Sequence, residues 1–384
     1  MKHVQIAGAL AVATMVGLSV VPVSAHHSAA PHYDLEKHIE LKGVVTQFKF
    51  VNPHAYVFFD VTETTGKKTS WRCELAAATV LARLGWGLDI FPMKEAITIK
   101  GSPARREDNV CMLTSFIRAD GIEITREADV TKLYANRPTA AKLAPSATVR
   151  PVRLADGHVN LAGPWMPAGR GGGPRGGGRP GAPGDAAAPG ARAGRPGGPG
   201  GGGRGGDPAT DATEAGLAAS KKYDQKFDDP AIKCDPANIM FGWTHDRHVN
   251  EIVQTKDTIT LKYGYMDFVR TIHMNAPHPK TVKPSRGGHS IGTWDGDVLV
   301  VDTVGFLPGV IVPLSGLMHS DKLHVVERFA VDAAAKTLTR TFVAEDPLYL
   351  KVPRTGSDTQ DLTDEAPAKY NCVELSGKNN IRIK

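Results

Sequence analysis

Three histidines in the first part of the chain bring together nitrogen atoms suited to a metal ion. Cleavage after Ala25 would leave His26 at the new terminus, with a free amino group and an imidazole on one residue, and His27 beside it. His54, in an Asn-Pro-His turn, adds a third imidazole. Imidazole nitrogen suits copper, and copper heads the affinity order of divalent ions. We therefore predict a copper site at these residues, with a frayed terminus and a plain turn histidine as the alternative.

A second pattern has the spacing of a hydrolase nucleophile. Residues 288–292 read Gly-His-Ser-Ile-Gly, which fits the Gly-x-Ser-x-Gly elbow that projects a serine between a strand and a helix. The context does not fit, because the segment before Gly288 is polar and broken by prolines, and Asp295-Gly296 downstream indicates a hairpin. We expect no elbow at Ser290, and we expect the glycines to shape the start of a strand.

Charged residues fall on apolar strand faces in the second half of the chain. Glu327 alternates with Val325 and Phe329, so its carboxylate is predicted to point inward, where it must be paired or neutral. Arg270 and Arg340 occupy equivalent positions on other strands, so we predict an ion pair with one of them.

This polar interior has a functional and a structural interpretation. In the functional one, a pocket uses Glu327 and nearby imidazoles as acid and base, or to orient a polar group. Its candidate catalytic residues are Glu327, His289 and His319, and its candidate ligand-binding residues are Arg270, Arg340 and His278. In the structural one, which we favour, the charges form a salt bridge and the histidines are solvated loop residues.

The elements that must position these residues are mostly strands. From 39 to 126 the pattern is three strands, a helix over 76–86 and two further strands, with Val44, Phe48 and Phe50 expected on one side of the first. This order predicts an OB-like barrel. From 227 onward, hairpins at short spacing predict an antiparallel meander closed into a lipocalin-like barrel, a fold that can hold one small ligand.

Between these regions lies a segment that cannot form a core. Residues 166–208 contain 19 of the 41 glycines, and six arginines against two aspartates, which accounts for four of the six net positive charges. Such a composition predicts a disordered spacer. Arginine-glycine repeats bind single-stranded nucleic acid elsewhere, but an exported protein rarely meets it, so we predict no nucleic-acid partner.

The start of the chain and the cysteines indicate export. Lys2 precedes an apolar run that ends in Val23-Ser24-Ala25, which is typical of a signal peptide, with an uncleaved anchor as the alternative. No later stretch is apolar for long enough to span a membrane, so we predict a mature chain without an integral membrane segment, in the periplasm or secreted. The four cysteines form no Cys-x-x-Cys pair, and the pairing that stays within each domain joins Cys73 to Cys111 and Cys234 to Cys372.

Both halves resemble uncharacterised bacterial families. The first half resembles secreted proteins that start His-His-Ser; the shared features are His26-His27-Ser28, Tyr33-Asp34, Gly43-Val44-Val45, Asn52-Pro53-His54 and Trp71-x-x-Glu74. The second half resembles exported proteins common in soil bacteria; the shared features are Asn160-Leu161-x-Gly163-x-Trp165, Gly-x-Ser-x-Gly-x-Trp-x-Gly-Asp at 288–297, His319-Ser320, Glu327-Arg328 and Asp346-Pro347. Neither resemblance implies an activity.

The sequence thus predicts an all-β protein with one short helix. Its expected parts are a signal peptide (1–25), an OB-like domain (26–129), a connector and linker (130–226) and a second barrel (227–384). The expected function is periplasmic binding of a small-molecule ligand, with copper at the mature N-terminus. The alternatives are a hydrolase or isomerase acting in the second barrel, and an envelope scaffold.

Overall fold

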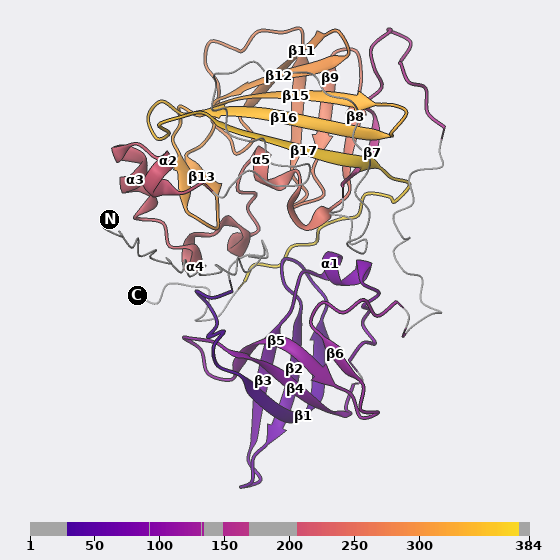
Figure 1. Ribbon diagram of the computed structural model, residues 1–384, viewed down its shortest axis with the longest axis vertical. Coiled ribbons are helices and arrows are strands. Elements are labelled where there is room, and N and C mark those ends of the chain that lie inside the picture. The colour runs from indigo at the N-terminus through magenta and orange to yellow at the C-terminus, as the bar shows by residue number, and fades with distance from the viewer. Residues whose placement is uncertain (1–28, 92, 132, 134–148, 169–205, 376–384) are drawn as a thin grey trace, which may run out of the picture.

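The computed structural model describes residues 29–91, 93–131, 133, 149–168 and 206–375. These residues form two closed β-barrels, and Figure 1 shows the N-terminal barrel below the C-terminal one. The predicted all-β fold with two barrels is confirmed. The predicted signal peptide, His26, His27 and residues 169–205 of the predicted linker lie outside the described residues.

The N-terminal barrel has the strand order expected from the sequence. Its elements are β1 (Ile39–Lys49), β2 (Tyr56–Thr62), β3 (Lys68–Glu74), α1 (Ala78–Arg83), β4 (Ala96–Pro103), β5 (Val110–Ile117) and β6 (Glu123–Thr125). β1 lies between β2 and β4, and β3 and β5 pair in parallel and close the barrel. The single helix between the third and fourth strands completes the OB-type order.

One disulfide joins the strands at that closure. Cys73 on β3 and Cys111 on β5 stand opposite each other in the ladder and are bonded, as the sequence predicted. Beneath them, Phe91 packs against Phe116 and against Trp86 with ring centroids 4.4 and 6.2 Å apart. These buried aromatic rings fill part of the core of this barrel.

The prediction of which β1 side chains point into the core is wrong at the centre of the strand. Val44 is 41% exposed and Val45 is fully buried, whereas Phe48 is buried as expected. The pairing of β1 with β2 shifts by one residue between Val45 and Gln47, which is a β-bulge. A bulge inserts one residue and reverses which side the preceding side chains face.

The C-terminal barrel contains nine strands. They are β7 (Gly163–Pro167), β8 (Asn250–Gln254), β9 (Thr258–Lys262), β10 (Val269–Met274), β11 (His289–Asp295), β12 (Val298–Val304), β15 (His324–Asp332), β16 (Thr337–Glu345) and β17 (Arg354–Leu362). All neighbours are antiparallel except β10 and β11, which are parallel. The barrel is therefore not a simple meander, because β7 lies between β17 and β8.

β7 lies in the range that the sequence analysis assigned to the connector. Its Trp165 pairs with Asn250 on one side and Leu362 on the other, so residues before the glycine-rich segment complete the second barrel. The run Gly-Pro-Trp-Met-Pro shows no alternation of polar and apolar residues, and two prolines lower its strand propensity. Burial in the barrel wall decides its conformation instead.

Short elements cover one side and one end of the C-terminal barrel. They are α2 (Pro208–Asp211), α3 (Glu214–Ser220), α4 (Gln225–Asp228), η1 (Pro230–Lys233), α5 (Ile239–Gly242), η2 (His245–Arg247), β13 (Gly309–Val312) and β14 (Leu317–His319). Figure 1 shows α2, α3 and β13 together beside the barrel. In the described part of the chain, no helix is long and apolar enough to cross a membrane.

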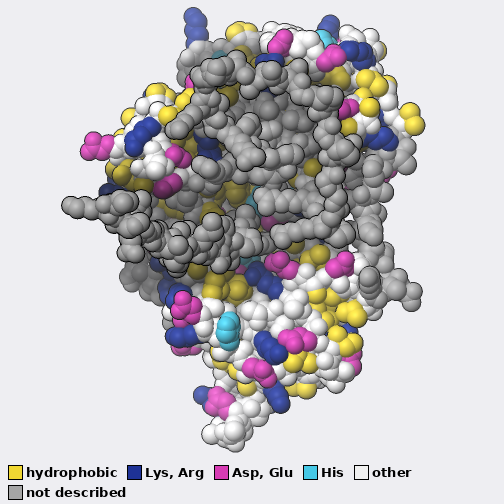
Figure 2. Space-filling model, in the orientation of Figure 1, with side chains coloured by type: hydrophobic (Ala, Val, Ile, Leu, Met, Phe, Trp, Pro, Cys, Tyr) yellow, Lys and Arg dark blue, Asp and Glu magenta, His cyan; other side chains and the backbone are white. Residues whose placement is uncertain are grey.

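Acidic and basic side chains are mixed on the visible face of the N-terminal barrel. On the face shown in Figure 2, acidic and basic side chains alternate over the coloured residues of this barrel without one large patch of either sign. A polyanion such as nucleic acid selects a continuous basic surface. This face of the barrel presents none among its described residues.

Candidate functional site

The first candidate site is centred on a buried carboxylate at the end of β3. Glu74 is only 7% exposed. One of its oxygens, Oε1, pairs with Nδ1 of His54, which lies in the turn before β2. The other, Oε2, accepts hydrogen bonds from the hydroxyls of Tyr33, at 2.9 Å, and Tyr56, at 3.3 Å. Three segments of the barrel thus converge on one acidic group.

The pKa values of the groups in this cluster are shifted in opposite directions. Burial raises the pKa of Glu74, but the charge and hydrogen bond of His54 and the hydrogen bond of Tyr33 outweigh it and lower that pKa to about 2. Burial, with the adjacent Glu74 charge, raises the pKa of the Tyr33 and Tyr56 hydroxyls well above the ordinary value. At neutral pH the carboxylate is ionised and both tyrosines donate. An ionised carboxylate can only accept, so Nδ1 of His54 is the nitrogen that donates to Glu74, and in a neutral imidazole the lone pair would then be on Nε2.

The turn that carries His54 is fixed from two sides. The Asn52–Pro53 peptide bond is cis. The side-chain oxygen of Asn52 accepts from the backbone nitrogen and the hydroxyl of Thr79, both at 3.2 Å, in the first turn of α1. The amide of Asn52 donates to the carbonyl of Tyr370 in the C-terminal tail, at 2.5 Å. Asn52 thus joins the turn to a helix of its own barrel and to the C-terminal tail at Tyr370.

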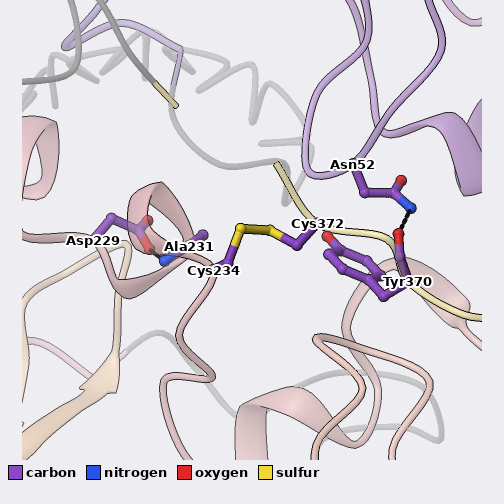
Figure 3. Close-up of a disulfide and its surroundings, with 6 residues drawn as sticks. All are labelled: Asn52, Asp229, Ala231, Cys234, Tyr370 and Cys372. Atoms are coloured by element: carbon purple, nitrogen blue, oxygen red, sulfur yellow. Dashed lines mark hydrogen bonds between the residues drawn. A yellow bond between two sulfur atoms is a disulfide. The ribbon is translucent and has the colours of Figure 1, made fainter. Parts of the chain in front are cut away.

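That C-terminal tail is held by the second disulfide. Cys372 is bonded to Cys234, which follows η1, and Figure 3 shows this bond beside Tyr370 and Asn52. The backbone nitrogen of Val373 donates to the carbonyl of Asn52 at 2.7 Å. The structure thus has the pairing that keeps each bridge within one domain, and this bond secures a tail from the C-terminal barrel against the His54 turn of the N-terminal barrel.

The interior of the C-terminal barrel holds a buried ionic network. Glu327 is fully buried, and its carboxylate pairs with Arg270 at 2.5 Å and with Arg340 at 3.2 Å. Arg340 also pairs with Asp358 on β17 at 2.6 Å and donates to two carbonyls of α5. The ion pair predicted for Glu327 is confirmed with both arginines. Each guanidinium is engaged by protein groups, as the structural interpretation expected.

Ser290 belongs to this network and not to a nucleophile elbow. Its hydroxyl accepts from Nε of Arg270 at 2.8 Å and lies 3.1 Å from the hydroxyl of Thr303. The strand β11 continues past Ser290 to Asp295 and turns through Gly296 into β12. The expectation that no strand-to-helix elbow exists here is confirmed. The serine is 2% exposed and cannot meet a substrate at the surface.

Four histidines and an aspartate meet on the outer face of the same barrel. Nδ1 of His278 lies 2.9 Å from Nδ1 of His289, and Nε2 of His278 lies 2.9 Å from Asp302. Asp302 also accepts from Nε2 of His324 at 2.8 Å. The ring of His273 stacks on that of His289 with centroids 5.1 Å apart. Partial burial, with the charges of His278 and His273, lowers the pKa of His289.

A half-open pocket adjoins this histidine cluster. Its volume is about 320 Å³, and its lining includes His273, His289, Arg286 and the backbone of Gly287 and Gly288. This volume is within the range that small ligands occupy. The sequence analysis expected a ligand inside the barrel, whereas this pocket opens on its outer side.

The predicted catalytic residues lie apart. Glu327 is in the interior, His289 is on the outer face, and His319 is buried in β14, where its Nδ1 donates to the carbonyl of Ser320 at 3.0 Å. Among the residues that the structure describes, no hydrogen bond or ion pair joins any two of these three. Of the predicted ligand-binding residues, Arg270 and Arg340 share the ionic network and His278 does not.

Of the predicted copper ligands, only His54 is described, since His26 and His27 lie outside the described residues. The described residues contain no group of three or more His, Cys, Asp or Glu side chains placed to hold a metal ion. Sequence reasoning missed Glu74 as the partner of His54, with Tyr33 and Tyr56 on its other oxygen, and Asp302 as the partner of His278, with His324 on its other oxygen. Tyr33 and Glu74 were visible as shared features of the first resemblance, which was the available signal.

The comparison with known families finds a match in the region that contains the first of these sites. Residues 14–112 match the model of a family of unknown function, DUF6152. The matched segment includes Tyr33, His54, Tyr56 and Glu74 and ends in β5. It is about a quarter of the chain, so it marks a similarity of the N-terminal region to that family. No curated protein and no solved structure matches the chain.

Proposed function

We propose that this is an exported copper-binding protein whose N-terminal barrel holds Cu(II) between the mature N-terminus and His54. The observation that carries the proposal is the pairing of His54 Nδ1 with the buried carboxylate of Glu74. Histidines that bind metals almost always donate their other ring nitrogen to a carboxylate or carbonyl, which fixes the tautomer and raises the basicity of the ligating nitrogen.

The remaining nitrogen of His54 is suited to a metal. The His54 side chain is 25% exposed, and Nε2 makes no hydrogen bond to a described residue. The pKa of Glu74, about 2, keeps the carboxylate charged across the range in which copper binds. Tyr33 and Tyr56 occupy its other oxygen, so Glu74 acts on the metal through His54.

Covalent geometry allows the other predicted ligands to reach His54. Tyr33 donates to the same carboxylate as His54. His27 precedes Tyr33 by six positions, and six residues of chain span at most about 20 Å. The amino group and imidazole of His26 would then complete a nitrogen-rich set, which favours copper over zinc.

The test is a Cu(II) and Zn(II) titration of the mature protein, with its first residue established by mass spectrometry. We expect a tight Cu(II) equivalent that His54→Ala weakens at least tenfold and Glu74→Gln weakens about 10- to 100-fold. His38→Ala, which removes an exposed histidine of the same barrel, is the matched control and leaves the affinity unchanged. Wild-type affinity in both His54→Ala and Glu74→Gln would refute the proposal.

A further inference from the structure

We propose that His278 and His289 form a second metal site, a two-imidazole site for a square-planar divalent ion, Cu(II) or Ni(II), on the outer face of the C-terminal barrel. The site goes beyond the proposed function, because it uses other residues on the other barrel. It stands or falls independently of His54.

The first argument is the distance between the two nitrogens. Nδ1 of His278 and Nδ1 of His289 are joined by a hydrogen bond of 2.9 Å, and a metal ion would take the place of the proton between them, which would be released to solvent. Two nitrogens bound to one metal at about 2.05 Å and at a right angle are separated by about 2.9 Å, whereas tetrahedral geometry separates them by about 3.3 Å. The pair is thus already spaced as neighbouring ligands of a square-planar ion.

The second argument is the support behind His278. Its Nε2 donates to Asp302 at 2.9 Å, and the second oxygen of Asp302 accepts from Nε2 of His324 at 2.8 Å. With the proton of His278 on Nε2, Nδ1 carries the lone pair and faces His289. This is the carboxylate–histidine arrangement that orients metal-binding imidazoles, and here the carboxylate is itself fixed by a further histidine.

The third argument is the position of the ligands: His289 lies on a strand, and the groups that hold His278, which is in the loop between β10 and β11, also lie on strands. His289 begins β11, Asp302 is on β12 and His324 begins β15, and these three strands are neighbours in the barrel wall. The ring of His273 on β10 stacks against His289 and restricts its rotation. The side chain of His278 is 21% exposed and that of Asp302 38%, and His289 lines the open pocket, so an ion can enter from solvent.

The local charge also suits a cation. Asp302 is the acidic group that contacts the cluster, through the imidazoles of His278 and His324. The nearby cation Arg286 is paired with Asp235 at 2.7 Å and does not oppose the ion with an unpaired charge. With only two protein ligands, water completes the coordination, so this site should bind more weakly than the N-terminal one.

The test uses the full mature chain carrying His26→Ala, His27→Ala and His54→Ala together, which removes the imidazoles of the first site. We titrate Cu(II), Ni(II) and Zn(II) by calorimetry and record the Cu(II) electron paramagnetic resonance spectrum. We expect one remaining Cu(II) equivalent with nitrogen coupling in its spectrum, and Zn(II) affinity at least tenfold lower. His278→Gln and His289→Gln should each weaken Cu(II) binding at least tenfold, and Asp302→Asn about tenfold or more.

His158→Gln is the matched control, because this histidine stacks on Trp294 away from the cluster. It should leave Cu(II) binding unchanged, and circular dichroism of all variants should match that of the parent. Copper binding unaffected by both His278→Gln and His289→Gln overturns the site, and Zn(II) affinity equal to that of Cu(II) overturns its square-planar assignment. Failure of the first proposal can be told apart from failure of this one. It would appear as the absence of a Cu(II) equivalent that depends on His54, whereas failure here would appear as Cu(II) binding that does not depend on His278 or His289.

Discussion

His54 and Glu74 are 20 positions apart in the chain and form a direct pair at the end of the N-terminal barrel. The barrel brings them together because β2 and β3 are antiparallel and Tyr56 pairs with Glu74, which places the turn before β2 next to the last residue of β3. The pair joins the proposed copper ligand to a described carboxyl group whose pKa is lowered to about 2.

Acid should weaken the fold through Glu74. Its folded-state pKa is about 2, below the ordinary value of 4.5, so its stabilising effect is complete above pH 4.5 and is lost as the pH falls toward 2. The difference corresponds to about 3 kcal/mol. Urea unfolding between pH 7 and pH 2.5 should show wild type losing this much more stability than Glu74→Gln. Parallel curves for the two proteins would contradict the assignment.

Breaking the interior network should be costly. Glu327→Gln leaves Arg270 and Arg340 buried with less compensation, and removing one partner of a buried pair typically costs about 3–5 kcal/mol. Arg328→Ala breaks the exposed pair with Asp295 on the outer face and should cost below about 1 kcal/mol. Denaturant unfolding compares the two, and equal losses would show that the network contributes no more than a surface contact.

The second disulfide should stabilise the C-terminal barrel and its tail. The bond between Cys234 and Cys372 spans a sequence separation of 138, for which the chain-entropy model gives about 5 kcal/mol. A double replacement by serine should lower the free energy of unfolding by a large part of this. It should also speed amide hydrogen exchange at Val373, which donates to Asn52. Unchanged exchange would mean that the tail holds its place without the bond.

Two glycines in similar conformations should respond differently to alanine. Gly288 and Gly296 both have positive φ, 64° and 59°. A Cβ on Gly288 would lie 2.7 Å from the carbonyl oxygen of Val304, whereas a Cβ on Gly296 meets nothing within 4 Å. Gly296→Ala should cost about 1 kcal/mol, the cost of the left-handed conformation, and Gly288→Ala clearly more. Thermal unfolding of the two variants measures the difference.

The architecture was largely predictable because local signals agree with it. In the N-terminal region, alternating strands, the position of one helix and short turns specify the OB-type order. In the C-terminal region, Asp295-Gly296 marks the hairpin of β11 and β12. The facing of Val44 could not be predicted, because a β-bulge leaves no mark in the pattern.

β17 was not predicted because its inward side chains are polar. Asp358 pairs with Arg340, and Gln360 accepts from Asn250 at 3.1 Å, so the strand has no apolar face to reveal it. The partners of the candidate sites were missed for a related reason. Nothing in the linear spacing of His54 and Glu74, or of His278 and Asp302, shows that the fold brings them into contact. The contact of Glu327 with Arg270 and Arg340 could be predicted, because each of these charged residues lies on the apolar side of an alternating strand.

The central claim is that His54 binds copper through Nε2 while Glu74 holds Nδ1. The most direct measurement is anomalous X-ray scattering at the copper edge from crystals of the copper-loaded mature protein. The account predicts a peak about 2 Å from Nε2 of His54, the usual length of a metal–imidazole bond. Copper peaks elsewhere in the molecule, with none bonded to His54, would contradict it.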